Sequence, residues 1–189
     1  MREHEIRRAL LDELASMHLD DTLIVEEMGL DQGAIRVDVA IVNGLLSGYE
    51  IKSDWDNLER LPAQRDVYNA VFDEVTVVAG RRHLPKVLPL VPEWWGVVVA
   101  ERIDDGSPLQ VERPASRNPG RDPAMLARLL WRDEAVAVLA RRGVACASGA
   151  SRRVLWARLA DQLTVDELSL EVRCALKARS GWSTARPRS

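Results

Sequence analysis

One stretch of the chain, residues 34–52, limits the fold more than any other. In AIRVDVAIV, residues 34–42, apolar and other side chains alternate, as in a β-strand with one face on the core. Asn43-Gly44 follows, and this pair is a strong signal for a tight turn between antiparallel strands. LLSGYEIKSD then supplies the returning strand. The sequence therefore predicts a β-hairpin that turns at Asn43-Gly44.

The segments on either side of the hairpin favour an α/β fold. Apolar residues three and four apart predict helices, and β-branched runs predict strands. The order helix, three strands, helix, strand (αβββαβ) predicts a mixed sheet rather than a serial βαβ fold. The predicted elements are a helix over 3–17, a strand over 22–30, the hairpin, a helix over 56–71 capped by Asp56 or Asn57, a strand over 74–80, a short helix over 82–90 and a strand over 95–100.

The C-terminal part is expected to be all helical. Residues 101–121 are rich in Pro, Gly, Ser and charge, which is typical of a linker between a domain over 1–100 and a helical subdomain over 122–183. The final residues, 184–189, should fray. The helix signals are Asp122 as a cap with Pro123 at the first position of a helix ending at Gly143, Ser151 as the cap of a second helix, and Thr164-x-x-Glu167 as the capping box of a third ending at Gly181.

Composition excludes several classes of protein. With 189 residues and 47% hydrophobic content, the chain suits one medium domain with or without an appendage. It has no apolar run of membrane length, and its charged start does not resemble a signal peptide. Cys146 and Cys174 are the two cysteines, without a CxxC pair, so neither a zinc site nor a disulfide is indicated. We expect a reduced, cytoplasmic protein with no membrane partner and no small-molecule cofactor.

Charge is distributed unevenly along the chain. Residues 1–112 contain 11 Lys and Arg against 22 Asp and Glu, whereas residues 113–189 contain 15 against 7. This division predicts two parts with different partners. The alternative is that the two parts neutralise each other by packing together.

Three charged residues of the hairpin form a candidate site. Folding at Asn43-Gly44 should bring Asp38 beside Glu50, and Lys52 shares a face with Glu50 because the two are two positions apart on a strand. Two carboxylates a few ångströms apart repel each other, and a divalent cation removes that cost. Hard oxygen ligands suit Mg²⁺ or Mn²⁺. Lys52 would lie beside the ion, where it could orient a water and stabilise charge on a phosphate. The alternative is a solvated polar face with a cross-strand ion pair.

Further polar residues stand near this constellation in the predicted fold. Gln64 and Tyr68 are four apart on the helix after the hairpin, so they share a face that can look back at it. Extra carboxylates are available at Glu5 in the first helix and at Glu26 and Glu27 in the first strand.

Together, Asp38, Glu50-Ile51-Lys52 and Gln64-x-x-x-Tyr68 resemble the PD-(D/E)XK nuclease superfamily. This is the restriction-endonuclease-like fold, and the Q-x-x-x-Y spacing is similar to its RecB-like branch. Residues 36–80 are also similar to small, poorly characterised bacterial members of that superfamily. Val37 stands where the superfamily name has proline.

The resemblance implies Mg²⁺- or Mn²⁺-dependent phosphodiester hydrolysis of nucleic acid, with DNA as the first candidate, in repair, recombination or defence. It implies metal binding by Asp38, Glu50 and the backbone carbonyl of Ile51, with Glu5, Glu26 or Glu27 as a further ligand. Lys52 would assist the nucleophile, and Gln64, Tyr68 and Arg36 would contact nucleic acid or support the site.

The basic tail adds a second candidate nucleic-acid contact. Residues 134–163 are similar to SAP-type helix-extension-helix modules, which bind DNA. The alternative is a helical cap on the acidic core with solvated arginines. The candidate phosphate contacts are Arg141, Arg142, Arg152, Arg153 and Arg158.

Two other functions compete with a nuclease. One is a non-catalytic nucleic-acid-binding or regulatory protein on the same fold, and the other is an adaptor that binds a protein through the acidic core. The sequence leaves the oligomeric state open, a homodimer included.

Overall fold

The computed structural model describes residues 1–17, 21–103, 106–147 and 149–180. Its centre is a six-stranded mixed sheet in the order β1-β2-β3-β4-β5-β6. Strands β1 to β3 are antiparallel, β3, β4 and β5 are parallel, and β6 returns antiparallel to β5. The strands are β1 (Leu23–Leu30), β2 (Ile35–Val42), β3 (Leu46–Lys52), β4 (Glu74–Gly80), β5 (Gly96–Ala100) and β6 (Leu109–Arg113).

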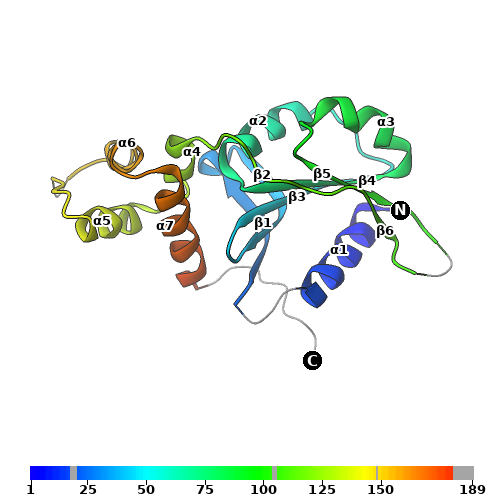
Figure 1. Ribbon diagram of the computed structural model, residues 1–189, viewed down its shortest axis with the longest axis horizontal. Helices are drawn as coiled ribbons and strands as arrows, with labels where there is room; N and C mark the ends of the chain where they lie inside the picture. The colour runs from blue at the N-terminus through cyan, green and yellow to red at the C-terminus, as the bar shows by residue number, and fades with distance from the viewer. Residues whose placement is uncertain (18–20, 104–105, 148, 181–189) are drawn as a thin grey trace.

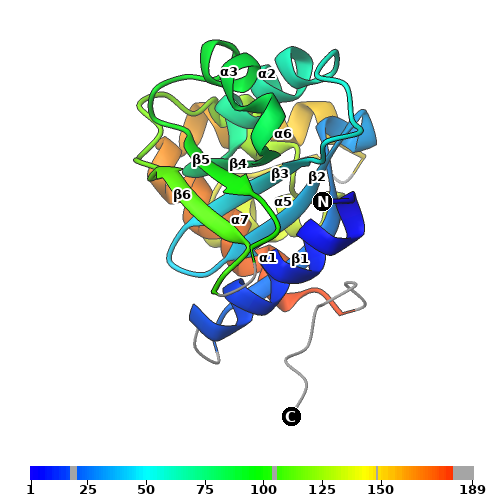
Figure 2. The same cartoon turned by 90° about the vertical axis from the view of Figure 1, so that its right-hand side faces the viewer.

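Helices cover both faces of this sheet (Figure 1). Helix α1 lies against one face, and α2 and α3 lie against the other, while α4 to α7 group at one end (Figures 1 and 2). The predicted αβββαβ order, mixed sheet and helical C-terminal region are confirmed. The α-helices are α1 (Glu3–Met17), α2 (Leu61–Val71), α3 (Leu84–Val87), α4 (Pro123–Ala127), α5 (Arg132–Arg141), α6 (Arg152–Gln162) and α7 (Val165–Ala178), and the 3₁₀ turns are η1 (Asp31–Gly33), η2 (Arg81–His83) and η3 (Leu88–Leu90).

Each face of the sheet has its own apolar core. On the α1 side, Ile6 and Leu10 pack with Ile41, Ile51 and neighbouring residues. The core on the other side is larger and continues from the sheet and α2 into the C-terminal helices. Its members include Leu46, Phe72, Val75, Leu126, Leu139, Leu159 and Val172. The helical region therefore shares a core with the sheet.

The predicted hairpin is present, with β2 and β3 pairing from Val42 opposite Leu46 to Val39 opposite Tyr49. The Asn43 side chain accepts a hydrogen bond from the Leu45 backbone amide at 2.9 Å, which closes the turn. Gly48 lies under Phe72, where a Cβ atom would meet the Phe72 ring at 2.8 Å.

The start of the second helix was predicted too early. Helix α2 begins at Leu61 after Arg60, instead of near residue 56. Asp56 caps no helix, because its carboxylate accepts the Ser53 backbone amide at 2.7 Å and closes a turn directly after β3. Asn57 binds the Glu59 amide at 3.2 Å in the same connection.

The segment 101–121, expected to be a linker, contains regular structure. Within it, β6 adds an edge strand to the sheet, with Leu109 opposite Ala100. Further on, Asn118 donates to the backbone carbonyls of Asn69 and Phe72 at 2.7 and 2.8 Å. Much of this segment is therefore held against the sheet and α2, by the backbone bonds of β6 and by the Asn118 side chain, which composition does not reveal.

Most of the predicted caps in the C-terminal region are confirmed. The Asp122 carboxylate accepts the Ala124 amide at 2.7 Å, and Thr164 with Glu167 forms a capping box. Ser151 caps α6. The single helix expected up to Gly143 is instead two, α4 and α5, which are interrupted between Ala127 and Arg132. The predicted end at Gly181 and the frayed residues 184–189 lie outside the described residues.

The uneven charge is partly neutralised by packing. Asp73, between α2 and β4, is 2% exposed and lies 2.6 Å from Arg121, 3.2 Å from Arg117 and 3.7 Å from Arg173. A buried carboxylate paired with arginines from distant parts of the chain ties the C-terminal region to the sheet. Packing together, the alternative explanation for the charge pattern, therefore accounts for part of it.

Candidate nuclease-like site

Asp38 lies where the hairpin strands separate. The last paired residues are Val39 and Tyr49, so one further step along the ladder would place Asp38 opposite Glu50. Instead, the Asp38 side chain takes the place of a backbone acceptor, and its Oδ2 receives the Ile51 amide at 2.7 Å. The carboxylate is thereby fixed next to the Glu50-Ile51-Lys52 segment, as the hairpin predicts.

The second oxygen of Asp38 is held by an arginine from α1. Arg7 Nη2 lies 2.8 Å from Asp38 Oδ1, from Glu27 Oε1 and from Glu3 Oε1. Its Nη1 also donates to the Asp38 backbone carbonyl at 3.1 Å. Burial works against the charge of Arg7, but the three carboxylates outweigh it and the pKa of Arg7 is raised. Arg7 therefore links helix α1 to strands β1 and β2.

Sequence reasoning did not include Arg7. The available signal was its position four residues after Glu3, on the same helix face, which allows both side chains to reach one point on the sheet.

Glu50 is buried within a network of neutral and cationic donors. Lys52 Nζ and Gln64 Nε2 donate to its Oε1 at 2.5 and 2.6 Å, and the Tyr68 hydroxyl donates to its Oε2 at 2.6 Å. Gln64 Oε1 accepts Lys52 Nζ at 3.1 Å, so the lysine is oriented from two sides. Because Glu50 is 2% and Lys52 8% exposed, the alternative of a solvated polar face is wrong.

Tyr68 lies in the apolar core and reaches Glu50 from there. It is fully buried, stacks on Trp95 at 6.0 Å between ring centroids, and packs edge-on against Phe72. Burial and the neighbouring charge of Glu50 raise the pKa of Tyr68, so its hydroxyl stays protonated and donates. Tyr68 is thus placed to hold Glu50 from inside the core.

The negative charges of Asp38 and Glu50 repel each other. Burial, with the charge of Glu50 as the second cause, raises the pKa of Asp38 to about 6. The Ile51 amide, Arg7 and Lys52 act in the opposite direction without cancelling the rise. A cation between Asp38 and Glu50 would relieve this repulsion.

Asp38, Glu50 and Lys52 line one pocket of about 860 Å³, the nuclease-like pocket. Gln64 and Arg36 also line it, as do Glu3 and Glu27 from the Arg7 cluster. The Arg36 side chain is 64% exposed and lies 3.8 Å from Glu27, while its backbone carbonyl is 3.0 Å from the Tyr68 hydroxyl. The pocket thus collects every member of the predicted hairpin site, with Gln64 on its wall and Tyr68 behind Glu50.

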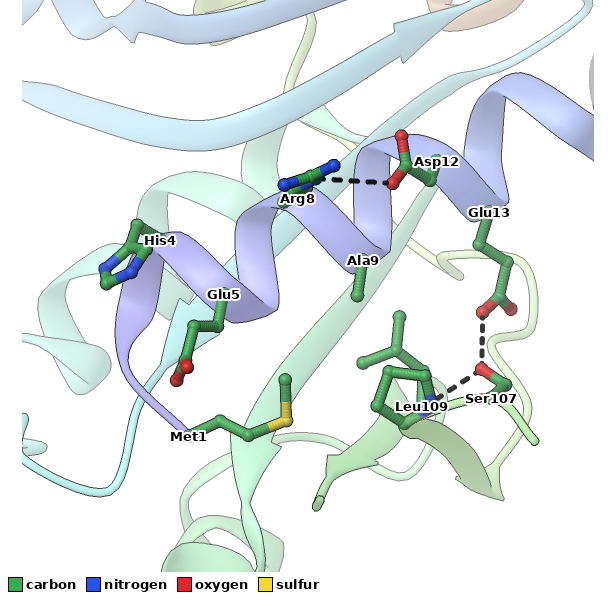
Figure 3. Close-up of a pocket in the computed structure, with 10 residues that line it drawn as sticks. Met1, His4, Glu5, Arg8, Ala9, Asp12, Glu13, Ser107 and Leu109 are labelled. Carbon is green, nitrogen blue, oxygen red and sulfur yellow. Dashed lines mark hydrogen bonds and ion pairs between the residues drawn. The ribbon is translucent and has the colours of Figure 1, made fainter. Parts of the chain in front are cut away.

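Two of the predicted extra carboxylates do not join this pocket. Glu5 lines a different pocket, of about 770 Å³, between α1 and the start of β6 (Figure 3). Glu5 is two residues from both Glu3 and Arg7, which is a rotation of about 200° around the helix axis, so it points to the opposite side of α1. Arg102 pairs with it there. Glu26 is absent from the described lining of the nuclease-like pocket, which receives Glu27 instead.

Among the described residues, no group of three or more His, Cys, Asp and Glu is arranged to hold a metal. The cation that the two acids could share would therefore rely on Asp38, Glu50 and a backbone oxygen, with water or phosphate as its other ligands. Mg²⁺ is commonly bound in this way, by one or two carboxylates with several waters.

The five arginines predicted as phosphate contacts differ in whether they already bind other parts of the chain. Arg141 and Arg142 pair with Glu171 at 2.5 Å and Glu167 at 2.8 Å, and Arg158 donates to the Ala145 carbonyl. These three arginines therefore bind partners within the helical region.

Arg152 and Arg153 are exposed near the first turn of α6. With Arg128 they line a separate pocket of about 390 Å³ beside Trp156 and Gln32. Gln32 and Gly33 are neighbours in η1, and Gly33 lines the nuclease-like pocket, so the two pockets flank one turn.

A family model described as bacteriophage P4 protein cII matches residues 1–185. The chain belongs to this family. Protein cII of Enterobacteria phage P4 is 37% identical over 99 residues, which are 52% of this chain and 38% of that protein. The chain thus covers about two fifths of the length of that curated relative.

A solved structure, the SPO1766 protein of unknown function from Silicibacter pomeroyi, is 19% identical and has a TM-score of 0.47, covering 75% of this chain and 89% of that one. No described helix is long and apolar enough to cross a membrane.

Proposed function

We propose that this member of the family is a metal-dependent nuclease that hydrolyses phosphodiester bonds of nucleic acid, with DNA as the favoured substrate. One observation carries the proposal: Asp38, Glu50 and Lys52 line a single pocket. The superfamily resemblance assigns these three residue types to metal binding and to assistance of the nucleophile.

The donor set fits Mg²⁺ or Mn²⁺. Asp38 and Glu50 would hold the ion with the carbonyl of Ile51, and both acids are already oriented by protein donors. When bound, the ion would lower the pKa of a water and offset charge on the phosphate. This also gives a physical reason for holding Asp38 where burial and the charge of Glu50 raise its pKa.

The residues around the ion site have separate roles in this proposal. Lys52, oriented by Glu50 and Gln64, places a positive charge in the pocket, where it can align a water and stabilise the developing phosphorane charge. Tyr68 and Gln64 fix the Glu50 carboxylate, and Arg7 fixes Asp38. Arg152 and Arg153, across the η1 turn, are available to the phosphates of a longer strand.

The test is cleavage of single-stranded and duplex DNA and of RNA by purified protein with Mg²⁺ or Mn²⁺. Glu50→Gln and Lys52→Ala should each reduce cutting by at least 100-fold, a loss of about 3 kcal/mol of transition-state stabilisation. The matched control is Lys86→Ala, an exposed lysine on α3, which should cut as wild type does. Circular dichroism should show all variants folded. Cutting that persists in both site variants would refute the assignment.

A second candidate is a nucleic-acid-binding protein without turnover on the same fold. It is favoured by one feature: every oxygen of Asp38 and Glu50 already accepts a hydrogen bond from the protein. In particular, Arg7 supplies Asp38 with the positive charge that a metal would otherwise bring. This candidate predicts binding that is unchanged by Glu50→Gln and no cutting with either metal.

A further inference from the structure

We propose that Trp55 is a stacking platform for an unpaired base of the bound strand, which would make single-stranded or locally unpaired nucleic acid the preferred substrate. The inference rests on the proposed function, since it describes what the nuclease-like pocket binds. It concerns the same pocket, because Trp55 lines it together with Glu50 and Lys52.

Trp55 contributes little to the folded core. Its side chain is 68% exposed, and it belongs to neither apolar cluster of the described residues. A large aromatic ring left in water gains almost none of the free energy that burial would give it. The position is instead suited to a contact with something outside the chain.

Hydrogen bonds hold the backbone turn that carries Trp55. Directly after β3, the Ser53 amide donates to Asp56 Oδ2 at 2.7 Å, and the Asp56 amide donates to the Ser53 carbonyl at 3.1 Å. The Trp55 amide in turn lies 3.4 Å from the Ser53 hydroxyl. Because Ser53 is 3% exposed, the turn is anchored in the protein and fixes Trp55 three residues from Lys52.

The chemistry of the ring identifies the ligand. Aromatic rings bind bases of any sequence through their faces, whereas the bases of an intact duplex are already stacked on one another. The guanidinium of Arg2 lies 6.0 Å from the centre of the Trp55 ring, so a positive charge for an adjoining phosphate is present as well. A ring with a cation beside it, at the mouth of an acidic, metal-suited pocket, fits one nucleotide of an unpaired strand.

The experiment compares binding of a fluorescein-labelled oligothymidylate with binding of a labelled blunt-ended duplex made of two strands, by anisotropy in Ca²⁺, which also binds carboxylate oxygens. Trp55→Ala should weaken binding of the single strand by about 5- to 150-fold, the range for loss of one stacked base, while duplex binding changes by less than about twofold. Trp55→Phe should retain most of the affinity. The matched control is Trp131→Ala, because Trp131 is also exposed, at 61%, and lines no part of the nuclease-like pocket described here.

The outcomes separate this inference from the nuclease itself. Protein that cuts DNA with Mg²⁺ but binds both oligonucleotides equally well with or without Trp55 overturns the inference and leaves the nuclease intact. Selective loss of single-strand binding in Trp55→Ala, in a protein that never cuts, supports the inference and overturns the nuclease. A folded Trp55→Phe variant as weak as Trp55→Ala would overturn the inference, because a phenyl ring can also stack on a base.

Discussion

Replacing Asp38 by Asn should change how the stability of the protein depends on pH. The pKa of Asp38 is raised to about 6 in the folded protein, chiefly by burial and then by the charge of Glu50. An aspartate in an unfolded chain has a pKa of about 3.9. The asparagine can still accept the Ile51 amide, but it has no proton to release.

The sign follows from proton binding. Between about pH 4 and pH 6 the folded wild type holds a proton on Asp38 that the unfolded chain has lost, so its free energy of unfolding falls as the pH rises through this range. The contribution is fully present below about pH 4 and lost above about pH 6. The difference between the two pKa values corresponds to about 3 kcal/mol.

We therefore expect the free energy of unfolding of Asp38→Asn, relative to wild type, to increase by about 3 kcal/mol between pH 4 and pH 8. The ion pair with Arg7 is not an additional cost in this comparison, because it exists only while Asp38 is charged and its effect is already contained in the pKa of Asp38.

The assay is urea unfolding in EDTA at a series of pH values. The control is Asp12→Asn, because the Asp12 side chain is 77% exposed and lies 3.9 Å from Arg8. Its pH profile should run parallel to wild type. A parallel profile for Asp38→Asn as well would refute the reasoning, because it would show that Asp38 titrates normally. Added Mg²⁺ should flatten the wild-type profile if the two acids share the ion.

Two further predictions concern the C-terminal region. Asp73→Asn should lower the free energy of unfolding in urea by about 3 kcal/mol, because the partly buried Arg121 and Arg173 lose the buried carboxylate that they share, and Arg121 keeps only the exposed Asp166. Asp66→Asn, at an exposed acid, should change the free energy of unfolding by less than about 0.5 kcal/mol. Arg152→Glu with Arg153→Glu should weaken DNA binding and reduce the salt dependence by about two phosphate contacts, as measured by anisotropy over a salt series, and an unchanged salt slope would contradict the proposed contact.

Local sequence signals were sufficient for much of the fold. The Asn43-Gly44 turn, the alternation of β2 and the cap at Ser151 are each decided by a few neighbouring residues. Features that depend on distant partners were not predicted. Strand β6, in a segment rich in Pro and Gly, exists because β5 offers it an edge. The late start of α2 has a local cause instead: the Asp56 side chain closes the turn after β3, so it caps no helix.

The same distinction holds for the candidate site. Asp38, Glu50 and Lys52 could be grouped because one hairpin carries all three, and the spacing of Gln64 and Tyr68 placed them on one helix face. Arg7 reaches the site from α1, which packs on the sheet through contacts that no local pattern specifies. Without the geometry of α1, Glu3 and Glu5 could not be distinguished, although a difference of two helix positions sends them to different pockets.

A purely structural role explains the charged cluster poorly. Buried ion pairs seldom stabilise a fold more than apolar residues of similar volume would, because desolvation offsets their attraction. Here Glu50 is buried and accepts hydrogen bonds from three donors. Asp38 lies near enough for the charge of Glu50 to disfavour the ionised form of Asp38. Arg7 pairs with Asp38, as with Glu3 and Glu27, but the pKa of Asp38 stays raised, so Arg7 does not cancel the effects of burial and of Glu50. This cost supports the proposed function, in which a ligand of opposite charge binds between the two acids, and a hard divalent cation would suit the oxygen donors present.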